Sequence, residues 1–123
     1  MSATFCRFTM IGRVLTQPRR ITYNKDGAEN VLCSFIIGTE PNDAEDGKKA
    51  QYSNCYNIQA YGKIAKSILN NFSKDDYVYM EGYPKSVKVA GHELGNTLFF
   101  TNYVAQYASL LNRAIKTAHD KEI

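Results

Sequence analysis

Basic residues interleaved with tyrosines are the part of this sequence best suited to binding chemistry. The chain has nine tyrosines and six phenylalanines but no tryptophan, and its formal net charge is +3. Cationic side chains bind phosphates and aromatic rings stack on bases, so this composition is typical of a surface that holds an unpaired polynucleotide. Tyrosine is also an ordinary strand residue, so composition alone does not establish such a surface. The cations considered are Arg7, Arg13, Arg19, Arg20, Lys25, Lys63, Lys66, Lys74, Lys85 and Lys88.

The remaining reactive residue types do not form a catalytic or metal-binding pattern. Cys6, Cys33 and Cys55 are too far apart for a paired-cysteine zinc site, and their odd number does not fit a disulfide framework. We therefore expect reduced thiols packed as small side chains. His92 and His119 are distant from each other and from any candidate nucleophile, and no phosphate-binding glycine motif is present. The sequence predicts a protein that is not an enzyme and that needs no cofactor and no metal.

Length and hydropathy limit the size and location of the protein. A chain of 123 residues with 44% hydrophobic residues is long enough for one small core. No apolar run is long enough to span a bilayer, and Met1–Thr4 lacks the basic start of a secretion signal. We expect a soluble, cytoplasmic protein with no membrane partner.

Residues 51–61 alternate between two faces, which predicts a strand buried on one side. The apolar face carries Tyr52, Tyr56, Ile58 and Ala60. The face expected to remain in water carries Ser53, Cys55, Asn57, Gln59 and Tyr61. After Gly62 the apolar period changes to three or four residues, which predicts a short helix. Its stripe consists of Ile64, Ala65, Ile68, Leu69 and Phe72. A helix this short is stable only when packed against other elements.

Most of the remaining sequence also predicts strands. A first strand covers Thr4–Leu15, is interrupted at Pro18 and resumes over Arg19–Tyr23, and an Asp26-Gly27 turn leads to a partner strand over Asn30–Thr39. At the centre of that partner strand we expect burial on both faces. A loop with four acids, Glu40–Ala50, is a candidate flap. Later elements are a strand over Val78–Gly82 that ends at Pro84, a long connection over Lys85–Asn96 and a strand over Thr97–Tyr107.

These elements predict a mostly all-β fold, a five-stranded Greek-key barrel of the OB-fold type with a short helix between strands three and four. We expect residues 1–107 to form this domain. Residues 108–123 form a short C-terminal segment, expected to be a helix that packs on its own barrel or on a neighbouring subunit. Its narrow apolar stripe consists of Ala108, Leu111, Ala114 or Ile115, and Ala118.

Over residues 5–107 the sequence resembles the bacterial-type single-stranded DNA-binding proteins. The motifs that carry the resemblance are Ile11-Gly12-Arg13-Val14, the Pro18 and Asp26-Gly27 turns, Phe35-Ile36-Ile37-Gly38-Thr39, Tyr61-Gly62-Lys63-Ile64-Ala65 and Val78-Tyr79-Met80-Glu81-Gly82. The resemblance implies a non-enzymatic protein that coats single-stranded DNA in replication, recombination or repair. It also implies a homo-oligomer, expected to be a tetramer, with a dimer as the alternative.

The resemblance also implies a set of DNA-binding residues. Tyr61 matches a base-stacking aromatic of the family, Lys63, Lys74 and Lys88 match basic positions along its DNA path, and Lys85 is a looser match. Together these residues would form a groove that holds phosphates while Tyr61 stacks on a base. The alternative role for Tyr61, which the sequence leaves open, is that of an aromatic residue at the edge of the core. We expect core or subunit-interface roles for Tyr52, Tyr56, Tyr77 and Tyr103.

The sequence departs from the family in two ways. Cys55 and Val89 stand where the family has tryptophans, which removes stacking surfaces worth roughly 1–3 kcal/mol per base. The candidate substitutes are Tyr79, Tyr83 and Phe99. The sequence also ends at residues 119–123 without the acidic, apolar tip with which the family recruits enzymes, so we do not expect such recruitment. An alternative function is therefore an OB-fold adaptor that binds protein or RNA.

Overall fold

The computed structural model describes residues 4–42, 51–89 and 98–113, in which one helix follows the fourth of six strands. In chain order the elements are β1 (Phe8–Val14), β2 (Arg19–Lys25), β3 (Ala28–Pro41), β4 (Tyr52–Tyr61), α1 (Gly62–Asn71), β5 (Tyr77–Val89) and β6 (Leu98–Asn112).

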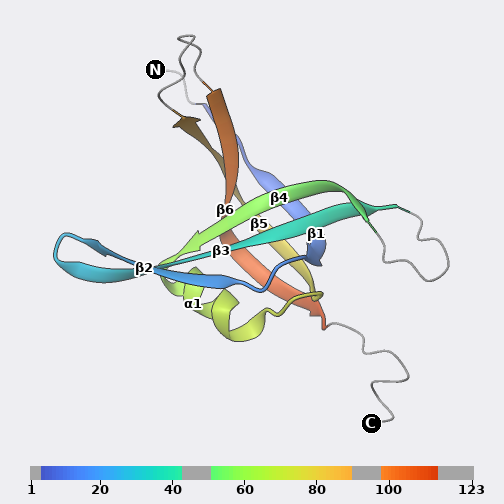
Figure 1. Cartoon of the computed structure of the whole chain (residues 1–123), viewed down its shortest axis with the longest axis horizontal. Helices are drawn as coiled ribbons and strands as arrows, with labels where there is room; N and C mark the ends of the chain where they lie inside the picture. Colours follow the sequence, from blue (N-terminus) through green and yellow to red (C-terminus); the bar gives the residue numbers. More distant parts are fainter. Residues whose placement is uncertain (1–3, 43–50, 90–97, 114–123) are drawn as a thin grey trace.

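Five of the strands close into a barrel. The hydrogen-bonded order is β1-β5-β6-β4-β3-β2, and β1 also pairs with β3 at Arg13 and Val14. This second pairing joins β1 to β3 and leaves β2 outside the barrel. Figure 1 shows β2 and part of β3 reaching away from the barrel as a hairpin, with α1 on one side of it. The architecture is the predicted OB-fold barrel.

The structure has six strands rather than five because the predicted first strand is split. β1 begins at Phe8 rather than at Thr4, and the chain leaves the strand conformation after Val14 until β2 starts at Arg19. Pro18 lies in this break, where its missing N–H costs no ladder hydrogen bond. The turn from β2 to β3 is as predicted: Asp26 and Gly27 both have positive φ, 53° and 77°, as a two-residue hairpin turn requires.

One face of β3 forms the centre of the core. Cys33, Phe35 and Ile37 are buried there against residues of β1, β4, β5 and α1. The expectation that β3 is buried on both faces is wrong, because Ile36 is 37% exposed on the opposite face. Inward side chains fill the barrel, whereas the outside of β3 is covered by Tyr52 and Leu15 at Gly38 and is open at Ile36.

The predicted helix is confirmed as α1. Ala65 and Ile68 are fully buried, and the helix contacts β3, β4 and β6. Phe72, which follows the helix, packs edge-on against Phe35 with ring centroids 6.3 Å apart. The helix therefore closes one part of the barrel and places Tyr61 at the junction of β4 and α1.

Two expectations about the last strands are wrong. Pro84 does not end its strand, because β5 continues to Val89 in register with β6. Beyond Gly82, β5 no longer pairs with β1, and a proline is tolerated where a strand has one free edge. The helix expected from residue 108 is also wrong for residues 108–112, which belong to β6 and pair with β5. The domain boundary expected at residue 107 therefore falls inside a strand.

The cysteines are free, as expected, but only Cys33 is packed in the core. Cys6 and Cys55 are exposed. Burial raises the pKa of the Cys33 thiol to about 11. The two exposed thiols are therefore the ones that a reagent in solution can reach.

Several expectations fall on segments outside the described residues. These are most of the candidate flap (residues 43–50), residues 90–97 with His92, residues 114–123 with His119, and the side chains of Val89 and Phe99. Within the described part of the chain, no helix has the length and apolar character needed to cross a membrane, and no group of metal-binding side chains occurs.

Candidate nucleic-acid interface

A row of side chains on the outside of β3 and β4 forms the centre of the candidate site. Directly paired residues of neighbouring strands share a face, and the pairs here are Leu32 with Tyr61, Ser34 with Gln59, Ile36 with Asn57 and Gly38 with Cys55. We call this surface the outer face. Along β4 it runs from Tyr61 to Cys55, which at about 3.3 Å per residue is a span of roughly 20 Å.

Tyr61 lies at the end of the outer face where α1 begins. Its side chain is partly exposed, and its hydroxyl group donates a 3.3 Å hydrogen bond to Oε1 of Gln59. The ring therefore lies on the opposite side of β4 from Ile58 and Ala60, which are in the core. This position leaves the ring available to a ligand.

Lys63 adds positive charge beside Tyr61. It is exposed in the first turn of α1, which contains no acidic residue and has no side-chain cap. The free N–H groups of a helix N-terminus carry partial positive charge, so this end of the outer face favours an anion.

Lys74 lies at the other end of the outer face, in the turn between α1 and β5. The turn is held to β1 by hydrogen bonds from Asp75 N to Val14 O (2.7 Å) and from Val14 N to Asp76 O (2.9 Å). The backbone N–H of Lys74 also donates to Oε1 of Gln17 at 3.0 Å. The position of the Lys74 backbone is therefore fixed relative to the barrel.

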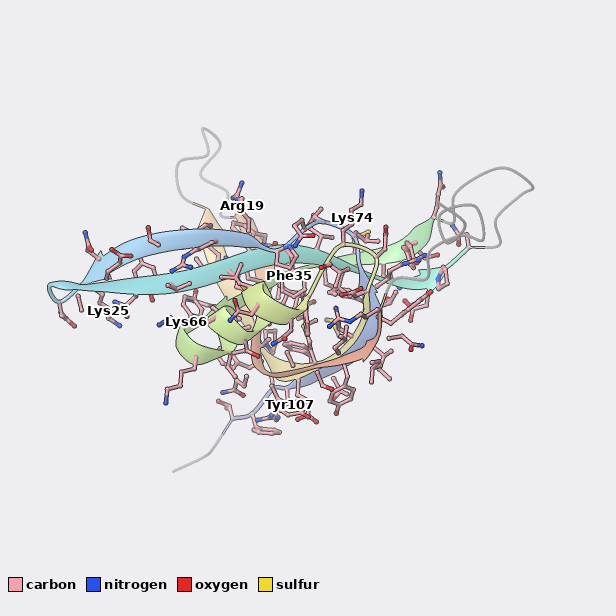
Figure 2. All side chains as sticks on the ribbon, turned by 90° about the horizontal axis from the view of Figure 1, so that it is seen from below. Arg19, Lys25, Phe35, Lys66, Lys74 and Tyr107 are labelled. Atoms are coloured by element: carbon pink, nitrogen blue, oxygen red, sulfur yellow. The ribbon has the colours of Figure 1, made fainter. Side chains whose placement is uncertain are left out.

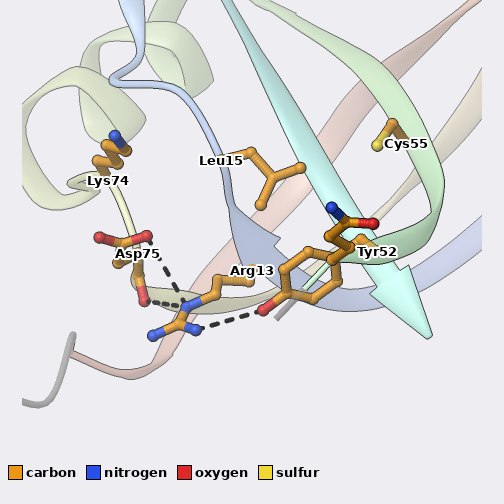
Figure 3. Close-up of a pocket in the computed structure, with 7 residues that line it drawn as sticks. Arg13, Leu15, Tyr52, Cys55, Lys74 and Asp75 are labelled. Atoms are coloured by element: carbon orange, nitrogen blue, oxygen red, sulfur yellow. Dashed lines mark hydrogen bonds and ion pairs between the residues drawn. The ribbon is translucent and has the colours of Figure 1, made fainter. Parts of the chain in front are cut away.

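A hollow of about 530 Å³ separates Lys74 from Cys55. Figure 3 shows Leu15 projecting between Lys74 and Tyr52, with Arg13 across the opening. Arg13 donates from Nη1 to the Tyr52 hydroxyl (3.3 Å) and from Nε to the Asp75 carbonyl oxygen (3.2 Å). The hollow therefore combines two cations, one of them (Arg13) 3.9 Å from the Asp75 carboxylate, with apolar walls and an exposed thiol. Its lining includes Cys55, for which the family resemblance implies a tryptophan position.

Lys85 lies on the same side of the sheet as the outer face. It pairs with Asn102 of β6, and Asn102 accepts a 2.7 Å hydrogen bond from Nδ2 of Asn57. Lys88 is three residues further along β5, so strand alternation directs it to the opposite face of the β5–β6 ribbon. Tyr61 and Lys85 therefore lie on the same side of the sheet, Lys63 and Lys74 lie at the two ends of the outer face, and Lys88 lies on the other side of the β5–β6 ribbon.

Among the candidate replacements for the missing tryptophans, Tyr83 is the one whose strand pairing connects it to the outer face. It is 39% exposed and pairs with Val104, which pairs in turn with Gln59. Tyr79 lies on a different part of the barrel, where it pairs with Ile11 and its ring packs against that of Tyr107 at 6.0 Å. Two of the tyrosines for which core or subunit-interface roles were expected, Tyr56 and Tyr103, are partly buried against the core and pack edge-on against each other with ring centroids 5.1 Å apart.

Arg19 and Asn57 are residues of this surface that the sequence analysis did not assign to the DNA-binding set. Arg19 pairs with Ser34 and so extends the outer face onto β2. Figure 2 shows Arg19 and Lys74 pointing to the same side of the molecule, with Tyr107 on the far side. The alternation of residues 51–61 placed Asn57 on the water-facing side, but only strand register shows that Arg19 lies near it.

Comparison with known proteins gives a family and a fold. The profile of the Single-strand binding protein family matches residues 5–111. Solved structures that the chain resembles include one of a Plasmodium falciparum SSB in complex with ssDNA, at a TM-score of 0.65 and 15% sequence identity. That match covers 91% of this chain and 97% of the other. No curated protein matches the sequence significantly.

Proposed function

The chain belongs to the single-strand binding protein family, and on this basis we propose that it binds and coats single-stranded DNA with little sequence preference. The observation that carries the proposal is the position of Tyr61, partly exposed on the outer face between Lys63 and the row that leads to Lys74. The ring stacks on a base while the ammonium groups bind phosphates. The protein acts as a binding protein rather than an enzyme, in the cytoplasm, in replication, recombination or repair.

We assign the DNA path to Tyr61, Lys63, Lys74 and Lys85, with Lys88 as a contact for a strand that passes around the β5–β6 ribbon. Lys85 and Lys88 lie on opposite faces of that ribbon, so one straight groove does not reach both. A flexible single strand that bends around the ribbon can contact both lysines.

A second surface supports the proposal of a homo-oligomer, with a tetramer expected. On the outside of β1, β5 and β6, Ile11 is 60% exposed and Tyr107 is 53% exposed. Within the described residues, β1 pairs with β3 only at Arg13 and Val14 and Gly12 packs closely against β3, so residues 8–11 present a free strand edge beside these apolar side chains. Such an edge pairs readily with the same edge of a second copy.

A salt titration tests the proposed function. Affinity for oligo-dT should fall with log salt at a slope of about −0.7 per phosphate neutralised, and Lys74→Gln should reduce that slope by about 0.7. Lys66→Gln is the matched control, because Lys66 is an exposed cation of α1 that Figure 2 shows on a different side of the molecule from Lys74. Equal affinity for duplex and single strands, or no binding at low salt, would reject the proposal. Stronger binding of RNA of matched length would favour the adaptor alternative.

Thiol labelling tests whether DNA covers the hollow. In a Cys6→Ser background, alkylation at pH 8 should modify Cys55 alone, because Cys33 is buried and its pKa is about 11. At that pH roughly one Cys33 thiol in a thousand is ionised. Oligo-dT should slow the labelling of Cys55 severalfold, and duplex DNA of equal length should not. Unchanged labelling at saturating oligo-dT would show that the strand does not pass over the hollow.

A further inference from the structure

A second, smaller hollow on the outer face has the chemistry of a base-reading pocket. It has a volume of about 280 Å³, and its lining includes Arg19, Ser34, Ile36 and Asn57. It lies two residues from Cys55 along β4, on the β2 side of the outer face. Ile36, which is 37% exposed, offers an apolar surface for a ring.

The amide group of Asn57 is held in one orientation. Its Nδ2 donates to Oδ1 of Asn102 at 2.7 Å, and its Oδ1 accepts from the Ser34 hydroxyl group at 3.4 Å. Asn102 is only 5% exposed, so this contact anchors Asn57 to the sheet. The second N–H of Asn57 has no other partner among the described residues. A side chain held in this way recognises a ligand without first losing rotational freedom.

Arg19 supplies the main donors of the pocket. It is exposed on β2 directly across from Ser34, and its guanidinium makes no hydrogen bond or ion pair with any described residue. A guanidinium carries five N–H donors in a fixed planar fork and has no acceptor. The oxygens of Asn57, Thr16 and Gln17 already accept hydrogen bonds from Ser34, Ile36 N and Lys74 N, so the guanidinium of Arg19 and the second N–H of Asn57 are the donors left for a ligand.

We propose that this pocket takes one base of the bound strand and favours guanine over adenine. Guanine presents O6 and N7 as adjacent acceptors, which match the two N–H groups of an arginine fork. Adenine presents an amino donor in place of O6, which meets the donors of Arg19 unfavourably. The two purines are close in size and both stack, so only their edges differ. The inference rests on the proposed function, since it requires that single-stranded DNA lies on the outer face.

Competition between short oligo-dT strands that carry one central guanine or one central adenine tests the proposal. We expect the guanine strand to bind about fivefold more tightly, the lower end of what a bidentate contact gives. Arg19→Lys keeps the charge but loses the fork, so the ratio should fall to about one. Arg20→Lys is the matched control: Arg20 pairs with the core residue Cys33, points to the other face of the hairpin and should leave the ratio unchanged.

The outcomes separate this proposal from the proposed function. Equal binding of both strands by the unmodified protein, or a ratio that survives Arg19→Lys, would overturn the guanine pocket while single-stranded DNA binding stands. Failure to bind either strand or oligo-dT at low salt would overturn both.

Discussion

Replacing Gly82 with alanine should destabilise the folded protein by about 3 kcal/mol, the upper end of the usual cost of overpacking. A Cβ atom at this position would lie 1.8 Å from the carbonyl oxygen and 2.8 Å from the carbonyl carbon of Val104. Both are backbone atoms and cannot rotate away, so β5 and β6 would have to separate. Gly82 also pairs with Phe8 of β1, and the disturbance would therefore reach the closure of the barrel.

Denaturant unfolding measures this effect, with Gly27→Ala as the control. A Cβ atom at Gly27 meets nothing within 4 Å, but the residue has a φ of +77°. That substitution should therefore cost only about 1 kcal/mol, from backbone strain without a steric clash. If the two variants unfold at the same denaturant concentration, the predicted clash between a Cβ atom at Gly82 and the backbone of Val104 does not destabilise the protein.

Removing the ring of Tyr61 should have the largest effect of any single substitution on DNA binding. Tyr61→Ala deletes a stacking surface worth roughly 1–3 kcal/mol, so the dissociation constant for oligo-dT should rise between about 5-fold and 150-fold. The loss should be similar for oligo-dA and oligo-dC, because every base has a π-face. Fluorescence anisotropy with labelled oligonucleotides provides the measurement.

Two further observations isolate the role of the ring. Tyr61→Phe keeps the ring and loses only the 3.3 Å hydrogen bond to Gln59, so its affinity should stay close to that of the unmodified protein. Tyr61 is partly exposed and its side chain does not cap α1, so Tyr61→Ala should change the unfolding midpoint little. Unchanged affinity in a folded Tyr61→Ala variant would mean that Tyr61 is an aromatic at the edge of the core.

The oligomer proposed above and the DNA path use different surfaces of the subunit. The exposed apolar side chains of Ile11 and Tyr107 lie on the outer surface of the sheet formed by β1, β5 and β6. Tyr61 and Asn57 lie on the outer face of β3 and β4. Figure 2 shows Tyr107 on the opposite side of the molecule from Arg19 and Lys74. A second copy on the apolar surface therefore leaves the outer face open to DNA.

Local patterns in the sequence were sufficient to predict most of the strands, the helix and the fold class, but not where β5 and β6 end. Alternation over residues 51–61 identified β4 and its two faces, and the three- and four-residue spacing after Gly62 identified α1. The Asp26-Gly27 turn predicted the β2–β3 hairpin. These features depend on residues close together in the chain, so a single sequence contains them. The stacking role of Tyr61 came from family resemblance, and its exposure on the outer face is consistent with that role.

Only the tertiary structure decided which distant residues share a surface. The pairing of Arg19 with Ser34, the contact between Asn57 and Asn102 and the separation of Lys85 from Lys88 all depend on strand register. The same is true of Pro84 and of residues 108–112, which continue strands because their partners extend beside them. Register is set by closure of the whole barrel, since shifting a strand by one residue exchanges its buried and exposed faces. Local sequence patterns do not contain that information.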